Sequence, residues 1–240
     1  MKCIILFLFL IAFSSQDQVD TSKMIIIYFT RTGNTELFAN YIKEKMNIET
    51  IFKIEPATPY PENYDETLAM ARNEQSNNLR PEIKDPLTDI SKYDIILLGT
   101  PLWFSHIPNV VITQLEKLDL NGKTIYSFNT HGSSGLGSTV TDIKQYAKGA
   151  TVKDDGFPLA GTYVRNNKEN AMNDISSWVE KNFGNINPSP EQAGTDKSTT
   201  DNKNNNEEEE DNDNYDDTVK LNSEFTKINY FLFLIILSLL

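Results

Sequence analysis

The sequence predicts an α/β fold in which helices cover both faces of a doubly wound, parallel sheet. Between about residues 22 and 184, strand-like apolar runs alternate with helix-like stretches, five of each. Such alternation argues for parallel strands joined by helical crossovers. The first run, residues 24–29, is continuously apolar and rich in β-branched residues, as expected of a strand buried on both faces, and residues 93–99 repeat this signature.

The remaining elements follow in order along the chain. The first predicted helix, residues 35–46, is amphipathic, with Phe38 and Ile42 on one face and Leu37 and Tyr41 on the other. A parallel sheet binds its ligand outside the carboxyl ends of the strands, so the strand-to-helix loops are where we expect a site. The other expected strands are residues 50–54, 123–128 and 157–160, and the other expected helices are residues 65–77, 110–118, 138–148 and 168–183.

The N-terminal end is expected to lie outside this domain. Residues 1–14 have the form of a secretory signal peptide, because a lysine precedes an unbroken apolar run and small residues near Ser14 suit cleavage. The alternative is an uncleaved membrane anchor, although the run is shorter than the roughly 20 residues that a spanning helix needs.

The C-terminal end is also excluded from the domain. Residues 185–227 predict a disordered acidic linker, because they are rich in Asn and Glu and hold few apolar residues. Residues 228–240 form an apolar tail, yet thirteen helical residues reach only about 20 Å. The tail is either a GPI attachment signal or a short membrane anchor that stays in place. Together the ends predict a protein of the secretory pathway that is membrane-associated, at the cell surface or on a lumenal face.

Composition excludes some classes of function. Residues 20–184 carry 17 Lys and Arg against 21 Asp and Glu, so the domain lacks the basic character of a nucleic-acid-binding protein. The only cysteine, Cys3, lies in the predicted signal peptide, which leaves the mature domain without disulfide or thiol chemistry. We expect no metal site.

The loop after the first strand is suited to an anion. Thr30, Thr32 and Thr35 supply hydroxyl donors, and Gly33 lets the backbone approach a ligand closely. The helix that follows offers free N–H groups and a partial positive charge at its N-terminus. The loop is not a Walker loop, because the Gly-Lys-Thr sequence is missing. A plain capped turn is the alternative, but one cap needs only one such residue.

Two further loops follow predicted strands. Residues 99–108 place Trp103 and Phe104 between two prolines, where a flat aromatic ligand can stack on them, although such rings commonly cover a core instead. Residues 129–138 form a loop rich in Gly and Ser that is able to hydrogen-bond a heterocycle. His131 in this loop lies near a redox centre or is an ordinary loop histidine.

Taken together, the three loops resemble those of the flavodoxin-like FMN-binding proteins. Residues 28–35 read Tyr-Phe-Thr-Arg-Thr-Gly-Asn-Thr, residues 59–61 read Pro-Tyr-Pro, and residues 130–138 read Thr-His-Gly-Ser-Ser-Gly-Leu-Gly-Ser, all as in one branch of that family. The resemblance spans residues 23–183 and implies a five-stranded sheet in the order 2-1-3-4-5. Ser105 and Ser133 depart from the pattern, because relatives carry glycine at these places, and this implies an altered stacking and redox potential.

The resemblance also implies FMN as the cofactor and assigns residues to it. The phosphate would be held by Thr30, Arg31, Thr32, Gly33, Asn34 and Thr35. The isoalloxazine ring would be flanked by Pro101, Leu102, Trp103 and Phe104 from the second loop and by Thr130, His131 and Gly132 from the third.

The implied function is that of an FMN-dependent redox protein, in which the flavin and no side chain carries the electrons. Two mechanisms stay open. One is an electron shuttle that works in one-electron steps, and the other is an NAD(P)H-dependent reductase that passes a hydride to a quinone-like acceptor. The alternative from a different class is a non-catalytic, membrane-tethered binding module that keeps only the fold. The hydroxyl-rich first loop speaks against this alternative.

Overall fold

The structure, a computed structural model, describes residues 19–184. The predicted signal peptide, acidic linker and apolar tail lie outside these residues. Among the helices described, none has the length and apolar character needed to span a membrane.

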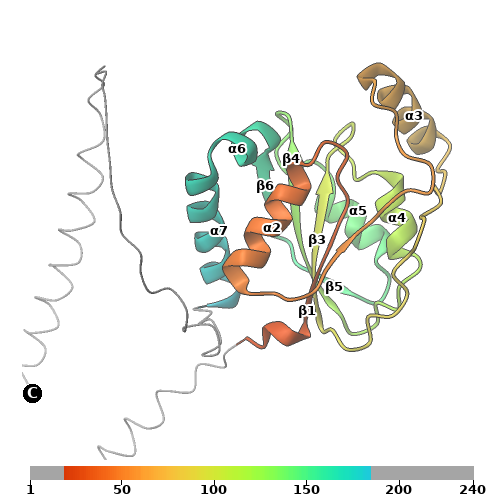
Figure 1. The fold of residues 1–240 in the computed structure, drawn as a ribbon. Helices are drawn as coiled ribbons and strands as arrows, with labels where there is room; N and C mark the ends of the chain where they lie inside the picture. Colours follow the sequence, from red (N-terminus) through yellow and green to blue (C-terminus); the bar gives the residue numbers. More distant parts are fainter. Residues whose placement is uncertain (1–18, 185–240) are drawn as a thin grey trace, which may run out of the picture. The chain divides into compact units, whose positions relative to one another are not determined.

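The sheet confirms the predicted fold class. Its strands are all parallel and lie in the order β2-β1-β3-β4-β5, with helices on both faces (Figure 1). A further strand, β6, also pairs with β4, beyond the end of β5. The strands are β1 (Met24–Tyr28), β2 (Ile51–Lys53), β3 (Ile95–Pro101), β4 (Thr124–His131), β5 (Thr151–Val152) and β6 (Phe157–Ala160).

The edge strand beside β4 is therefore in two pieces, where the sequence predicted one. The first piece, β5, pairs with the start of β4 at Thr124 and Ile125. The second piece, β6, has the predicted bounds and pairs with the end of β4 from Phe128 to His131. Two residues are too few to give a periodic sequence signal, which is why β5 was missed.

Each of the five predicted helices is present, with ends shifted by a few residues. The sequence did not predict the short helix α6 or the single 3-10 turn η1 before β1. The helices are η1 (Thr21–Lys23), α2 (Asn34–Met46), α3 (Tyr64–Ser76), α4 (Asn109–Leu115), α5 (Thr139–Tyr146), α6 (Gly161–Asn166) and α7 (Lys168–Phe183).

Side chains of β1 alternate between two hydrophobic cores, one on each face of the sheet. Met24 and Ile26 belong to the cluster beneath α2 and α7, whereas Ile25 and Ile27 belong to the cluster beneath α4 and α5. All four are almost completely buried. This explains the unbroken apolar run in the sequence, because neither face of the strand meets water.

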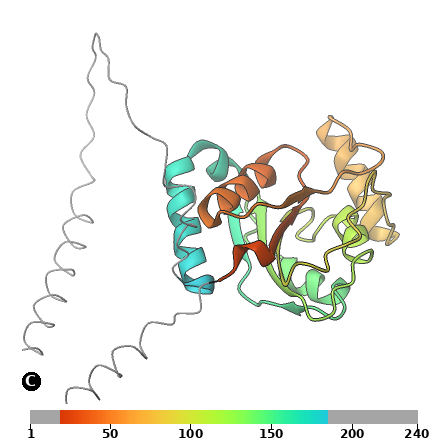
Figure 2. The same ribbon diagram turned by 60° about the horizontal axis from the view of Figure 1, so that its bottom comes forward.

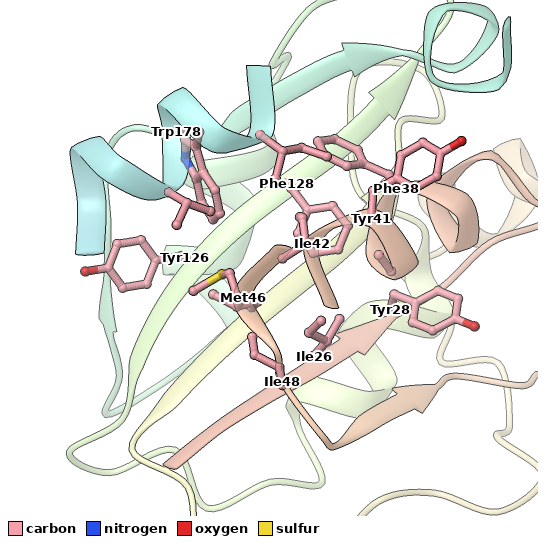
Figure 3. Packing of buried hydrophobic residues seen from close by; sticks show 14 of the residues in the cluster. Ile26, Tyr28, Phe38, Tyr41, Ile42, Met46, Ile48, Tyr126, Phe128 and Trp178 are labelled. Atoms are coloured by element: carbon pink, nitrogen blue, oxygen red, sulfur yellow. The ribbon is translucent and has the colours of Figure 1, made fainter. Parts of the chain in front are cut away.

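The first core is filled by aromatic rings (Figure 3). The rings of Phe38 on α2 and Phe128 on β4 meet edge to face, with centroids 4.9 Å apart. Tyr41 was predicted on the helix face opposite Phe38, and that prediction is wrong because Tyr41 is buried too. The reason is that α6 and α7 pack alongside α2 and widen its buried surface, as Figures 1 and 2 show.

Candidate functional site

A cavity of about 470 Å³ opens at the carboxyl ends of β1, β3 and β4. Its volume lies within the range of about 300–1,000 Å³ that is typical of small-ligand sites. All the predicted site residues except Gly33 line it. The lining residues are Thr30, Arg31, Thr32, Asn34, Thr35, Tyr64, Thr67, Leu68, Ala71, Pro101, Leu102, Trp103, Phe104, Thr130, His131, Gly132, Gly161 and Thr162.

Gly33 shapes the first loop without lining the cavity. It is the N-cap of α2 and has a φ of 85°, a left-handed conformation that glycine adopts without steric cost. Its N–H donates to the Thr30 hydroxyl oxygen at 3.0 Å, and its carbonyl accepts the N–H of Leu37 at 2.9 Å. The amides of the first turn of α2 therefore sit directly behind the loop, where an anion is favoured.

Arg31 lines the cavity, but its guanidinium is held by the chain that precedes α3. Its Nη2 donates to the carbonyl oxygens of Pro61 at 2.8 Å and Glu62 at 2.6 Å. These bonds connect the first loop to the start of α3. The residue therefore fixes the distance between two walls of the cavity, a role that the sequence did not predict.

The second loop is a tight turn that brings Trp103 to the cavity. The Trp103 ring lies edge-on to the rings of Phe29 and Tyr60, with centroid distances of 5.6 and 4.8 Å. Its carbonyl oxygen accepts a hydrogen bond of 2.9 Å from the Gln75 side chain. Trp103 packs against the core and lines the cavity as well. The expected packing against the core is therefore confirmed, and the stacking of a flat ligand on the ring stays a prediction.

Phe104 is more exposed than its neighbour, with 38% of its surface accessible. The guanidinium of Arg72 on α3 lies 4.9 Å from the centre of its ring, a cation–π contact. Figure 1 shows α3 at one corner of the molecule, beyond α4. The turn that carries Phe104 and the helix that carries Arg72 thus form facing parts of the rim of the cavity.

The third loop supplies polar groups to the cavity. The hydroxyl oxygens of Thr130 and Thr35 are 2.8 Å apart and buried, so β4 and α2 are joined at the cavity wall. The side chain of Asn129 donates to the Gly135 carbonyl at 2.9 Å and folds the loop back on itself. A methyl group added to Gly132 would meet no atom within 4 Å, so the cavity has free space above this residue.

His131 also belongs to this wall. Its Nδ1 is buried and has no hydrogen-bond partner among the residues that the structure describes. Burial lowers the pKa of the imidazole below its usual value of 6.5, so the ring is neutral at pH 7. His131 therefore brings an uncharged ring to the cavity.

Two walls of the cavity were not predicted from the sequence. Tyr64, Thr67, Leu68 and Ala71 lie on one face of α3, with the spacing of successive helical turns. That spacing was visible in the sequence, but nothing in it indicated which way the helix faces. Gly161 and Thr162 come from α6, and a helix of six residues is too short to show a period.

The cavity combines two kinds of surface. Hydroxyl groups and backbone amides gather at the first loop, whereas apolar and aromatic side chains line the second loop and α3. None of the lining residues, all of which the structure describes, is acidic. Within residues 19–184, no three His, Cys, Asp or Glu side chains gather as metal ligands would. The arrangement suits a ligand that has an anionic group at one end and a flat apolar ring at the other.

Comparison with known proteins agrees with this description. A family model described as flavodoxin matches residues 23–182 of the chain. A search of curated proteins gave no match.

Solved structures with the same fold include two proteins from Bacteroides that are provisionally assigned as flavoproteins. The Bacteroides uniformis protein is 25% identical, has a TM-score of 0.57, and aligns over 66% of this chain and 98% of its own. The Bacteroides eggerthii protein is 26% identical, has a TM-score of 0.54, and aligns over 67% of this chain and 97% of its own. A Lactobacillus acidophilus flavoprotein solved in complex with FMN is 22% identical, with a TM-score of 0.51, and aligns over 60% of this chain and 97% of its own.

Proposed function

Because the chain belongs to the flavodoxin family, we propose that it binds FMN in the cavity at the carboxyl ends of β1, β3 and β4 and transfers electrons through the bound flavin. The proposal rests on one observation, namely that the hydroxyl-rich first loop and the aromatic second loop line the same cavity. The flavoprotein from Lactobacillus acidophilus, which was solved with FMN, supports the choice of ligand.

The phosphate of FMN belongs at the first loop. The hydroxyls of Thr30, Thr32 and Thr35, the Asn34 side chain and the first-turn amides of α2 are the donors for it. Their partial positive charges stabilise a phosphate without the cost of burying a lysine. Arg31 supports this end of the site by holding the start of α3 in place.

The isoalloxazine ring belongs between the second and third loops. Pro101 to Phe104 form one side of this region, and Thr130 to Gly132 form the other. The half-buried Trp103 ring offers an apolar surface that excludes water. When bound, FMN supplies the capacity to accept and release one or two electrons, and the protein positions the ring and tunes its potential.

The electron donor and acceptor follow from the two mechanisms already named. As a shuttle, the protein exchanges single electrons with redox protein partners. As a reductase, it takes a hydride from NAD(P)H and reduces a quinone-like acceptor. Anaerobic addition of NADPH to the flavin-loaded protein separates the two, because bleaching of the flavin spectrum on the time scale of turnover requires the reductase mechanism.

We also propose where in the cell the protein lies, on the basis of the sequence outside residues 19–184. The signal peptide would direct the chain into the secretory pathway, and the apolar tail would hold the domain near a membrane. This arrangement raises the local concentration of the domain near a lipid-soluble acceptor.

The visible spectrum of the purified protein tests the central proposal. We expect the absorption bands of oxidised flavin, and chromatography of the ligand released by denaturation should identify FMN rather than riboflavin or FAD. A colourless protein that does not take up added FMN would contradict FMN binding and would favour the non-catalytic binding module.

A further inference from the structure

We propose that Arg165 is a positioning residue for the phosphate end of the site, and that it acts by turning the amide of Asn34 so that its NH₂ group faces the cavity. This inference rests on the proposed binding of FMN. The two residues are 131 positions apart in the chain and belong to α6 and to the first turn of α2.

Hydrogen bonding fixes the orientation of the Asn34 amide. Nη2 of Arg165 donates to Oδ1 of Asn34 at 2.7 Å, and Nε donates to the same oxygen at 3.2 Å. A guanidinium has only donors, so it donates to the carbonyl oxygen of an amide and repels the NH₂ group. The donor end of Asn34 must therefore point away from Arg165. Asn34 lines the cavity, and a donor is what an anionic ligand requires there.

Gly161 makes room for this orientation. It is the first residue of α6, one helical turn before Arg165, so both lie on the same face of the helix. A methyl group added to Gly161 would lie 2.5 Å from Nδ2 of Asn34, which is too close for the amide to stay where it is. One residue of α6 thus attracts the oxygen of the amide, and another leaves space for its nitrogen.

Ordering the Asn34 side chain before FMN binds lowers the entropic cost of binding. A free asparagine side chain samples several rotamers, and a ligand that selects one of them loses affinity by the entropy of ordering it. The hydrogen bonds from Arg165 order the side chain before the ligand arrives. The effect should be confined to ligands that carry the phosphate.

Titration with FMN and with riboflavin, which lacks the phosphate, tests the inference. Arg165→Ala should weaken FMN binding by about threefold to tenfold, the scale expected when one hydrogen bond to a charged group is impaired. Riboflavin binding should stay unchanged. Lys168→Ala is the matched control, since it removes an exposed cation that pairs with Glu44 instead of Asn34. This control should bind both flavins as the unsubstituted protein does.

A double-mutant cycle separates positioning from direct attraction of the phosphate. In an Asn34→Ala background, Arg165→Ala should cause no further loss of FMN affinity, because the side chain that it orients is gone. If Arg165→Ala still weakens FMN binding by the same factor in that background, Arg165 acts on the phosphate directly and the positioning role is overturned.

Gly161→Ala gives an independent test from the other end of the amide. It should lower FMN affinity by about as much as Arg165→Ala, because both substitutions displace the same donor. It too should have no effect once Asn34 is alanine. If Arg165→Ala binds FMN as tightly as the unsubstituted protein, positioning fails while FMN binding stands. If the unsubstituted protein binds no FMN, both proposals fail.

Discussion

Trp103 and His106 close the turn between them with two backbone hydrogen bonds. The N–H of Trp103 donates to the carbonyl of His106 at 2.9 Å, and the N–H of His106 donates to the carbonyl of Trp103 at 3.0 Å. The two residues inside the turn, Phe104 and Ser105, have φ values of 51° and 67°. A two-residue turn with both central residues in the left-handed region is the type I′ turn, which favours glycine and asparagine.

Ser105→Gly should therefore increase the free energy of unfolding by roughly 0.5–1 kcal/mol. The left-handed conformation costs a residue with a side chain about 1–2 kcal/mol. Part of that gain is offset, because glycine raises the entropy of the unfolded chain by an equivalent of about 0.4–1 kcal/mol. Urea denaturation of the two proteins measures the difference.

Ser133→Gly is the matched control for this prediction. Ser133 is also an exposed loop serine, but it is not among the described residues with positive φ. The substitution should destabilise the protein by about 0.4–1 kcal/mol through the unfolded chain alone. Equal changes in the free energy of unfolding for the two variants would show that the backbone strain at Ser105 does not lower the stability of the protein.

Two threonines of the first loop should discriminate between phosphorylated and free flavin. Replacing Thr32 by Ala and Thr35 by Val removes two hydroxyl donors, and hydrogen bonds to a charged group are worth about 1.5–3 kcal/mol each. FMN affinity should fall at least about a hundredfold, whereas riboflavin affinity should hardly change. Thr35→Ser keeps the hydroxyl and should bind FMN nearly normally. Equal losses of affinity for FMN and riboflavin would contradict the assignment of the phosphate to this loop.

Fluorescence should report whether Trp103 contacts the flavin. The chain has two tryptophans, Trp103 at the cavity and Trp178, which stacks on Phe157 in the first core with ring centroids 5.3 Å apart. In a Trp178→Phe variant, addition of FMN should quench most of the remaining emission. In a Trp103→Phe variant, the quenching should be much weaker. Normal FMN affinity and an unaltered reduction potential in Trp103→Ala would leave that ring with a packing role only.

The three loops were predictable because a parallel sheet fixes where its loops meet. Because residues 24–29 and 93–99 are predicted to be parallel buried strands, Thr30 and Trp103, which follow them, are expected at the same end of the sheet. Residue types then indicated the chemistry of each loop. The position of the site thus followed from local patterns and one rule of topology.

The remaining parts of the site depend on contacts that no local pattern encodes. Arg31 was assigned to the phosphate from its place in the first loop, but the carbonyls that hold its guanidinium lie about 30 residues away. The bond between Arg165 and Asn34 spans a still longer separation. Such side-chain pairings depend on how α6 and the segment before α3 pack, which a single sequence does not specify.

Cell fractionation tests the proposed role of residues 228–240. The full chain should pellet with membranes, and a chain without this tail should not. Release of the full chain by phospholipase C would indicate a GPI anchor, whereas retention would indicate an apolar anchor that stays in place. A full chain found entirely in the supernatant would contradict the membrane association.

Glu74 should make the stability of the protein depend on pH. Its side chain on α3 is buried, and one carboxylate oxygen, Oε2, accepts a hydrogen bond of 2.9 Å from the Tyr60 hydroxyl. The other oxygen has no partner among the residues that the structure describes. Burial raises the pKa of the carboxyl above its usual value of 4.5, and the bond from Tyr60 offsets part of that rise.

The sign of the effect follows from proton binding. At any pH between 4.5 and the raised pKa, the folded protein holds a proton on Glu74 that the unfolded chain has lost. The free energy of unfolding must therefore decrease as the pH rises through this window. Glu74→Gln cannot ionise, so its stability relative to the unsubstituted protein should improve as the pH increases from 4.5 towards neutrality. Urea denaturation across this range measures the change, with the exposed Glu180→Gln as the matched control. A constant difference between Glu74→Gln and the unsubstituted protein at every pH would show that burial does not perturb this carboxyl.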